Sequence, residues 1–171
     1  MGNRIRVDFS EHGRVFLPIH FMTIDSPVME AVRMKVDTGA DFTTLSKEVL
    51  FSLGYDYDWI KKHAITGKQY DISTAAGDVE TVGLVQMPLI NILGYEAKNW
   101  PFRVIMGEDR NFRNLLGRDL LAGFDYYFLN SKNSFEICRI DTFEPIYEFL
   151  PGQGINEISK DFLHIFHGDI C

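Results

Sequence analysis

Hydrophobic and polar residues alternate over short stretches of the chain as far as about residue 140, a pattern typical of β-strands. Residues 14–23 are mostly apolar, and residues 31–36 alternate before the chain reaches Asp37-Thr38-Gly39. Later stretches of the same kind follow at residues 84–92, 102–106, 125–129 and 134–140. The pattern therefore predicts a mainly β fold with turns between short strands.

The breaks between these stretches predict two hairpins and one or two short helices. Ser46 can cap a helix over residues 47–53 that ends at Gly54, and a second short helix is expected after Gly117. Residues 71–83 have two β-prone arms around Ala75, Ala76 and Gly77, which predicts a hairpin. Residues 130–133 predict another hairpin turn.

Length and composition favour one globular domain. The chain has 171 residues, of which 46% are hydrophobic and 24% charged. Composition changes near residue 141, so we predict a domain over residues 1–140 and an extension over residues 141–171. That extension is a tail, a dimer-clasping segment or a regulatory segment. There is neither a secretory leader pattern nor an apolar run long enough for membrane insertion, which predicts a cytoplasmic protein.

The charge and the metal-binding residue types exclude several classes of function. A formal charge of −7 with no basic cluster argues against a nucleic-acid partner. Cys138 and Cys171 lack the spacing of a zinc site. His164 and His167 lie three residues apart, but no cluster of further ligands joins them, so they are interpreted as packing or solvated residues. We expect no metal and no cofactor.

The sequence Asp37-Thr38-Gly39 carries the candidate chemistry. Gly39 allows a tight turn that brings amide donors close to the Asp37 carboxylate, and the Thr38 hydroxyl can hold such a loop rigid. Two carboxylates at hydrogen-bonding distance share one proton, so one activates water while the other donates to a substrate carbonyl. The sequence has one such triplet, so the second carboxylate must come from a second copy of the chain. This chemistry predicts a homodimer.

The residues from Val36 to Asp41 resemble the active-site signature of the retropepsins, the retroviral-type aspartic proteases. A second landmark of that family, two apolar residues and a glycine before a short helix, is matched by Leu115-Leu116-Gly117. The resemblance covers residues 14–140. It implies that Arg118 pairs with Asp41 and braces the active-site loop. It also implies that residues 71–83 form a flap whose tip, Ala75 to Gly77, covers the substrate.

The resemblance implies a small closed acid-protease barrel with one or two short helices and a flap hairpin. It also implies an aspartic endopeptidase that hydrolyses a protein or peptide substrate, with Asp37 and its dimer mate as the acid/base pair. Ala40 lacks the hydroxyl that would favour a charged carboxylate, so the dyad is expected to keep its shared proton to higher pH. We therefore expect activity in mildly acidic to near-neutral conditions.

Other interpretations remain open at this stage. Asp37 can be an ordinary turn aspartate, Asp41 and Arg118 a surface ion pair, and residues 75–77 an exposed turn. Asp119 is interpreted as an acid in the first turn of a helix. The whole chain can be a catalytically silent dimerisation or peptide-binding module, or a form inhibited by its own C-terminal segment.

Overall fold

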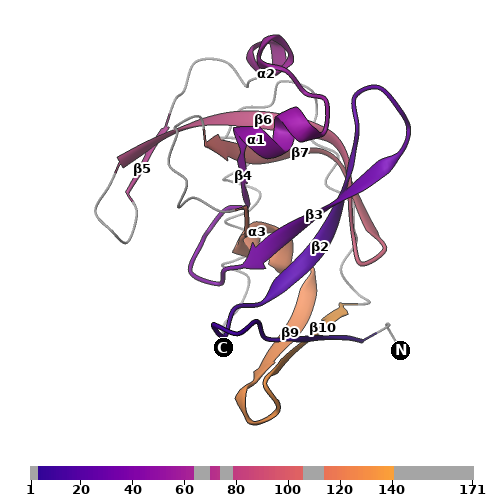
Figure 1. The fold of residues 1–171 in the computed structure, drawn as a ribbon, viewed down its shortest axis with the longest axis vertical. Helices are drawn as coiled ribbons and strands as arrows, with labels where there is room; N and C mark the ends of the chain where they lie inside the picture. The colour runs from indigo at the N-terminus through magenta and orange to yellow at the C-terminus, as the bar shows by residue number, and fades with distance from the viewer. Residues whose placement is uncertain (1–3, 64–69, 74–78, 106–113, 141–171) are drawn as a thin grey trace.

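The computed structural model describes residues 4–63, 70–73, 79–105 and 114–140, and shows a mainly β fold (Figure 1). The elements in chain order are β1 (Ile5–Asp8), β2 (Phe16–Met22), β3 (Met29–Val36), β4 (Thr44–Ser46), α1 (Lys47–Ser52), α2 (Tyr57–His63), β5 (Tyr70–Ser73), β6 (Val79–Ile92), β7 (Tyr95–Ile105), β8 (Leu115–Leu116), α3 (Arg118–Leu121), β9 (Phe124–Leu129), the 3-10 turn η1 (Asn130–Lys132) and β10 (Ser134–Arg139).

Six strands close into a barrel. Their order is β2-β3-β8-β4-β7-β6, and the pairing of β2 with β6 closes the ring, while β5 adds to the outer edge of β6. The two-residue strand β8 lies between β3, with which it is parallel, and β4, with which it is antiparallel. The prediction of a mainly β, closed barrel with few short helices is confirmed.

The barrel closes because alternate residues of its strands point inward and pack together. In β2, Leu17, Ile19 and Phe21 are fully buried, while the residues between them are partly or fully exposed. Side chains from the other strands complete this core, among them Met34, Leu45, Met87, Phe102, Val104 and Leu116. Burial of this apolar surface is the main stabilising contribution to the fold.

Helix α1 contacts β4 and helix α2 contacts β6, and both helices lie at one end of the barrel (Figure 1). Ser46 caps α1 by accepting a hydrogen bond from the Val49 amide, and Gly54 follows with φ +88°, as the sequence predicts. The buried Tyr55 hydroxyl donates to the carbonyl oxygen of Met22, and burial raises the pKa of Tyr55 to about 12. This bond ties the end of β2 to the helical segment.

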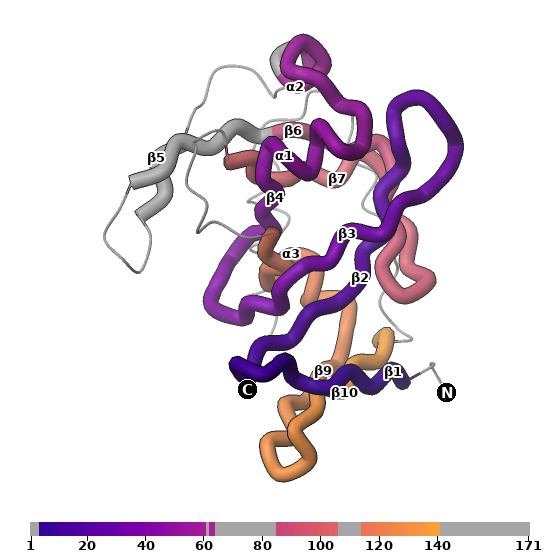
Figure 2. Tube along the Cα trace, viewed as in Figure 1, coloured from indigo at the N-terminus to yellow at the C-terminus, as the bar shows by residue number. Residues whose placement is uncertain are grey.

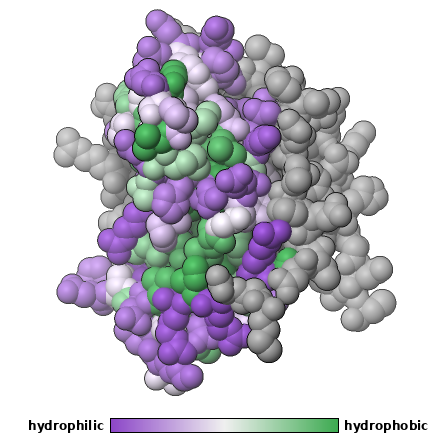
Figure 3. Space-filling model, turned by 90° about the vertical axis from the view of Figure 1, so that its right-hand side faces the viewer, coloured by the Kyte–Doolittle hydropathy of each residue, from purple (hydrophilic) through white to green (hydrophobic). Residues whose placement is uncertain are grey.

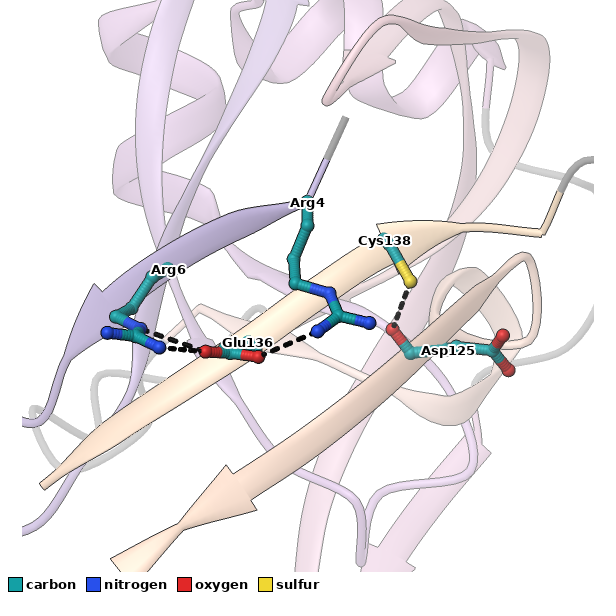
Figure 4. A network of polar contacts seen from close by, with 5 residues as sticks. All are labelled: Arg4, Arg6, Asp125, Glu136 and Cys138. Atoms are coloured by element: carbon teal, nitrogen blue, oxygen red, sulfur yellow. Dashed lines mark hydrogen bonds and ion pairs between the residues drawn. The ribbon is translucent and has the colours of Figure 1, made fainter. Parts of the chain in front are cut away.

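A separate three-stranded sheet, ordered β1-β10-β9, lies at the opposite end (Figure 2). Arg6 of β1 stands opposite Glu136 of β10, and Arg4 also reaches the same carboxylate (Figure 4). The hydrogen bond from Arg6 lowers the pKa of Glu136, and the positive charges of Arg6 and Arg4 act in the same direction. Glu136 is itself buried, so these contacts link β1 to β10 at a site largely shielded from water.

Part of the apolar surface remains outside the core. One face of the molecule shows hydrophobic surface in its middle and hydrophilic surface at its lower end (Figure 3). The large hydrophobic residues that are exposed are Ile24, Val28, Phe51, Tyr57, Tyr127 and Phe128. The last two lie on β9, at an edge of the three-stranded sheet.

Several element boundaries differ from the predicted ones. Strand β7 begins at Tyr95 rather than at residue 102, because Leu93 and Gly94 adopt positive φ angles and turn the chain sharply. Helix α3 ends at Leu121, whereas the sequence predicts a helix over residues 118–124. Helix α2 and the short strands β4 and β8 have no counterpart in the prediction, since they are fixed by tertiary pairing rather than by a local pattern.

Candidate active site

The candidate active-site loop, residues 37–42, leaves the end of β3 and is held from behind by the segment that enters α3. The Asp37 amide donates to the Leu116 carbonyl oxygen at 3.0 Å. Two amides at the start of α3 donate back to the loop. The Arg118 amide donates to the Ala40 carbonyl oxygen at 2.9 Å, and the Asp119 amide donates to the Asp41 carbonyl oxygen at 3.2 Å. These backbone bonds fix the loop at its start and along its length.

The Asp37 carboxylate is half-buried and has two partners within its own chain. The Gly39 amide donates to Oδ1 at 3.1 Å, and the Lys35 ammonium contacts Oδ2 at 3.1 Å. A Cβ added to Gly39 would lie 3.3 Å from Oδ1, so glycine lets the amide approach the carboxylate without crowding. The turn therefore supplies both the donor and the space that a functional carboxylate requires.

The residues after Asp37 have distinct positions. Thr38 is exposed on the loop, and the Ala40 amide donates to the Asp37 carbonyl oxygen at 3.1 Å, which closes the turn. The Thr38 hydroxyl is predicted to hold the loop rigid by bonding to backbone across a symmetric contact. That contact requires a second protomer, so this role stays a prediction.

Asp41 and Arg118 are in contact, although they are far apart in the sequence. The Arg118 guanidinium donates to Oδ1 of Asp41. The exposed fraction of the side chain is 51% for Arg118 and 65% for Asp41. The pair therefore connects the loop to the start of α3 at the surface, where water screens the charges.

A buried polar cluster lies directly behind the loop. Oδ1 of Asp119 accepts hydrogen bonds from the Thr43 amide at 2.9 Å, the Thr43 hydroxyl at 2.6 Å and the Leu120 amide at 2.9 Å. The Thr43 hydroxyl oxygen in turn accepts from the Gly117 amide at 3.0 Å. This cluster joins the strand after the loop to the start of α3.

Asp119 is in the first turn of α3, as expected, but its burial gives it a different role from a surface acid. Burial raises the pKa of the Asp119 carboxyl, and the hydrogen bonds from Thr43, Leu120 and Trp100 oppose that rise. Neither Thr43 nor Lys35 was singled out from the sequence. A hydroxyl residue shortly after the Asp-Thr-Gly triplet, and a lysine among apolar strand residues before it, are the signals that mark them.

Gly117 is required by close packing rather than by its backbone conformation. Its φ is −88°, but an added Cβ would lie 2.4 Å from the Phe42 carbonyl carbon and 2.7 Å from the Thr43 amide nitrogen. Real Cβ atoms do not approach backbone so closely. The glycine of the second landmark therefore lets the chain entering α3 pass directly against the strand that follows the loop.

The predicted flap lies partly within the described residues. Strands β5 and β6 pair antiparallel, with Ser73 opposite Val79, so the two arms form a hairpin. Its tip, including Ala75, Ala76 and Gly77, lies outside the described residues, as do His164, His167 and the predicted extension over residues 141–171.

Among the residues that the structure describes, no three His, Cys, Asp or Glu side chains are grouped so that they could hold a metal ion. No helix in the same part of the chain combines the length and the hydrophobicity needed to span a bilayer.

Comparisons with known proteins agree with this geometry. Residues 29–122 match the family described as gag-polyprotein putative aspartyl protease. That stretch is more than half of the chain and includes both the candidate loop and α3. The chain therefore belongs to this family, and its retropepsin-like character, inferred from the Asp-Thr-Gly loop and the Leu-Leu-Gly segment, is confirmed.

Two solved structures match the chain. A retropepsin-like aspartic protease from Rickettsia conorii is 23% identical, with a TM-score of 0.57, covering 80% of this chain and 99% of its own. The retroviral protease-like domain of Ddi1 from Leishmania major is 20% identical, with a TM-score of 0.47, covering 82% and 96%. No curated protein matches the sequence.

Proposed function

We propose that this protein is an aspartic endopeptidase that cleaves a protein or peptide substrate, with Asp37 as the catalytic residue of each protomer. The observation that carries the proposal is the Asp37 carboxylate, half-buried at the end of β3 and held by the Gly39 amide. It lies in a loop braced by Arg118 and by the buried Asp119 cluster. A fixed carboxylate of this kind suits acid/base chemistry.

The proposed active form is a homodimer, because one chain supplies one carboxylate. Two loops related by a twofold axis would bring the two Asp37 side chains together, so that they share a proton. The edge strand β9 exposes Tyr127 and Phe128, which supports contact with a second copy in this part of the fold. Thr38, exposed on the loop, is in a suitable place to bond across such an axis.

The proposed reaction needs no covalent intermediate. The ionised Asp37 takes a proton from water as that water attacks the scissile carbonyl carbon, and the protonated Asp37 of the partner donates to the carbonyl oxygen. Collapse of the resulting tetrahedral species transfers a proton to the leaving nitrogen and breaks the peptide bond. The β5–β6 hairpin, with Ala75 to Gly77 at its tip, is the proposed cover over the substrate.

We further propose that the enzyme works in the cytoplasm at mildly acidic to neutral pH. This proposed pH range rests on Ala40, which brings no hydroxyl to the carboxylate. Residues 141–171 are proposed to form an extension outside the protease domain.

The test compares wild type, Asp37→Asn and the control Asp25→Asn for cleavage of a diverse peptide mixture. Asp25 is an exposed aspartate in the turn between β2 and β3. Assays across protein concentration and from about pH 4 to 8 bracket the titration of a shared-proton pair. We expect wild type and Asp25→Asn to cleave the peptides and Asp37→Asn not to cleave them. At protein concentrations low enough for the dimer to dissociate, the cleavage rate should rise more steeply than linearly with concentration. Equal cleavage by Asp37→Asn would refute the catalytic role.

Absence of cleavage in all three proteins would be followed by the same assay on a chain that ends at residue 140. Activity restored by this truncation would mean inhibition by the C-terminal segment. Continued inactivity, with a dimer present in solution, would favour a silent dimerisation or peptide-binding module.

A further inference from the structure

Lys35 is a charged residue that lies between two buried residues of β3. Its neighbours Met34 and Val36 point into the core, with exposed fractions of 0% and 7%. Residues two apart in a strand share a face, so Lys35 and Asp37 emerge on the same side. The Lys35 side chain is 31% exposed and that of Asp37 is 29% exposed, which places both at one partly open surface.

The backbone of Lys35 is fixed from both sides. Lys35 lies opposite Phe16 of β2 and beside Leu115 of β8, and its amide donates to the Asn114 carbonyl oxygen at 2.8 Å. Its position is therefore set by the barrel, and only its long side chain can adjust. The ammonium lies 3.1 Å from Oδ2 of Asp37.

This placement brings a cation close to the reacting bond. In the proposed reaction, the scissile carbonyl lies within about 3.5 Å of the water held by the carboxylates. A group in contact with Oδ2 of Asp37 therefore borders the space occupied by the substrate side chains on either side of that bond. Arg118 is paired with Asp41, so its charge already has a partner.

In the proposed dimer, the positive charge next to the two Asp37 side chains exceeds their negative charge. The dyad carries one negative charge when it shares a proton, whereas the two Lys35 side chains, one from each protomer, carry two positive charges. One ammonium remains without a full counter-charge at the dyad. An acidic substrate side chain would supply it, and a basic side chain would be repelled.

We propose that Lys35 determines specificity, selecting substrates that carry Asp or Glu immediately next to the scissile bond. The inference rests on the proposed peptidase function and adds the class of substrate. The alternative is that Lys35 only holds the Asp37 carboxylate, in which case its removal would change the rate for all peptides equally.

The first experiment maps cleavage sites in a proteome-derived peptide mixture by mass spectrometry. It compares wild type with Lys35→Met, Lys35→Arg, Lys35→Glu and the control Lys98→Met, an exposed lysine of β7. We expect wild type, Lys35→Arg and Lys98→Met to favour acidic residues beside the cleaved bond by roughly tenfold. Lys35→Met should lose this preference, and Lys35→Glu should favour basic residues instead. Identical residue preferences in wild type and Lys35→Met would overturn the proposal, as would an equal change in rate for all peptides.

A second experiment measures binding and does not depend on cleavage. Pools of peptides with a reduced, non-cleavable central bond carry Glu, Gln or Lys on either side of that bond. Wild type should retain the Glu pool more strongly than the Gln pool, and Lys35→Met should retain both equally. If this charge preference in binding is observed but no peptide is cleaved, the peptidase function is rejected, whereas the role of Lys35 in selecting acidic residues is supported. Binding without a charge preference, or no binding at all, would overturn the assignment.

Discussion

Thr43 and Asp119, which are 76 residues apart in the sequence, share two hydrogen bonds behind the candidate loop. Removal of the carboxylate leaves the buried Thr43 amide and hydroxyl without their acceptor. Asp119→Ala should therefore lower the free energy of unfolding by about 3 kcal/mol, measured by urea denaturation. Asp119→Asn keeps an oxygen acceptor and should lose much less. Equal losses in both variants would contradict this account.

The titration of Asp119 provides a second, independent prediction. Because its pKa is raised in the folded state, the folded protein holds the proton more tightly than the unfolded chain. Stability contributed by the protonated carboxyl is present at low pH and is lost as pH rises through the raised pKa. Asp119→Asn cannot titrate, so the unfolding free energy of wild type minus that of the variant should shrink as pH rises above about 4. A difference that grows with pH would show that the assigned direction is wrong.

Gly117→Ala tests whether the chain entering α3 must touch the strand after the loop. The added Cβ would meet the backbone of Phe42 and Thr43, which cannot move aside as a flexible side chain can. We expect a loss of about 3 kcal/mol in unfolding free energy, or failure to fold. The contrasting variant is Gly13→Ala, where nothing lies within 4 Å of the added Cβ but φ is +67°. Backbone strain there should cost about 1 kcal/mol, and similar losses at both positions would contradict the packing explanation.

Glu136→Gln tests the ion pairs that hold β1 against β10. The pKa of Glu136 is lowered by Arg6 and Arg4, so its stabilising contribution is present near neutral pH. That contribution is lost as pH falls through about 4.5 toward the lowered pKa. Denaturation midpoints of wild type and Glu136→Gln should therefore differ at pH 7 and converge in acid. Glu11→Gln, an exposed residue between β1 and β2, is the matched control and should follow wild type at every pH.

Arg118 and Asp41 should matter more for activity than for stability. Their side chains are half exposed or more, so a double-mutant cycle with Arg118→Met and Asp41→Asn should give a coupling below about 1 kcal/mol in unfolding free energy. If the pair positions the catalytic loop, the same variants should reduce kcat/KM by roughly tenfold to a hundredfold. A coupling well above ~1 kcal/mol in unfolding free energy, together with an unchanged kcat/KM, would show that the pair stabilises the fold and does not position the loop.

Much of the architecture follows from local sequence patterns. The mostly apolar residues 14–23 predict β2, the alternation in residues 31–36 predicts β3, and Ser46 and Gly54 predict the limits of α1. These signals are local because pleating and helix capping act over a few residues. The start of β7 was missed because Leu93, rather than Asn or Gly, takes the first positive φ of its turn.

The candidate site was only partly visible from the sequence. The Asp-Thr-Gly triplet and the Leu-Leu-Gly segment identify the loop and its support. The bonds of Asp119 to Thr43 and of Lys35 to Asp37 depend on side-chain burial and direction, which the fold determines. An aspartate at the start of a helix is usually a surface residue, and burial by the barrel overrides that expectation here.

The position of β8 also constrains the order of events during protein synthesis. Leu115 and Leu116 fill the place between β3 and β4, two strands that leave the ribosome much earlier. Until residues 115–119 have emerged, the Asp37 amide lacks its partner at Leu116 and Thr43 lacks Asp119. A nascent chain that ends before this segment therefore cannot assemble the loop. Any activity of the site is delayed until nearly the whole described domain has been translated.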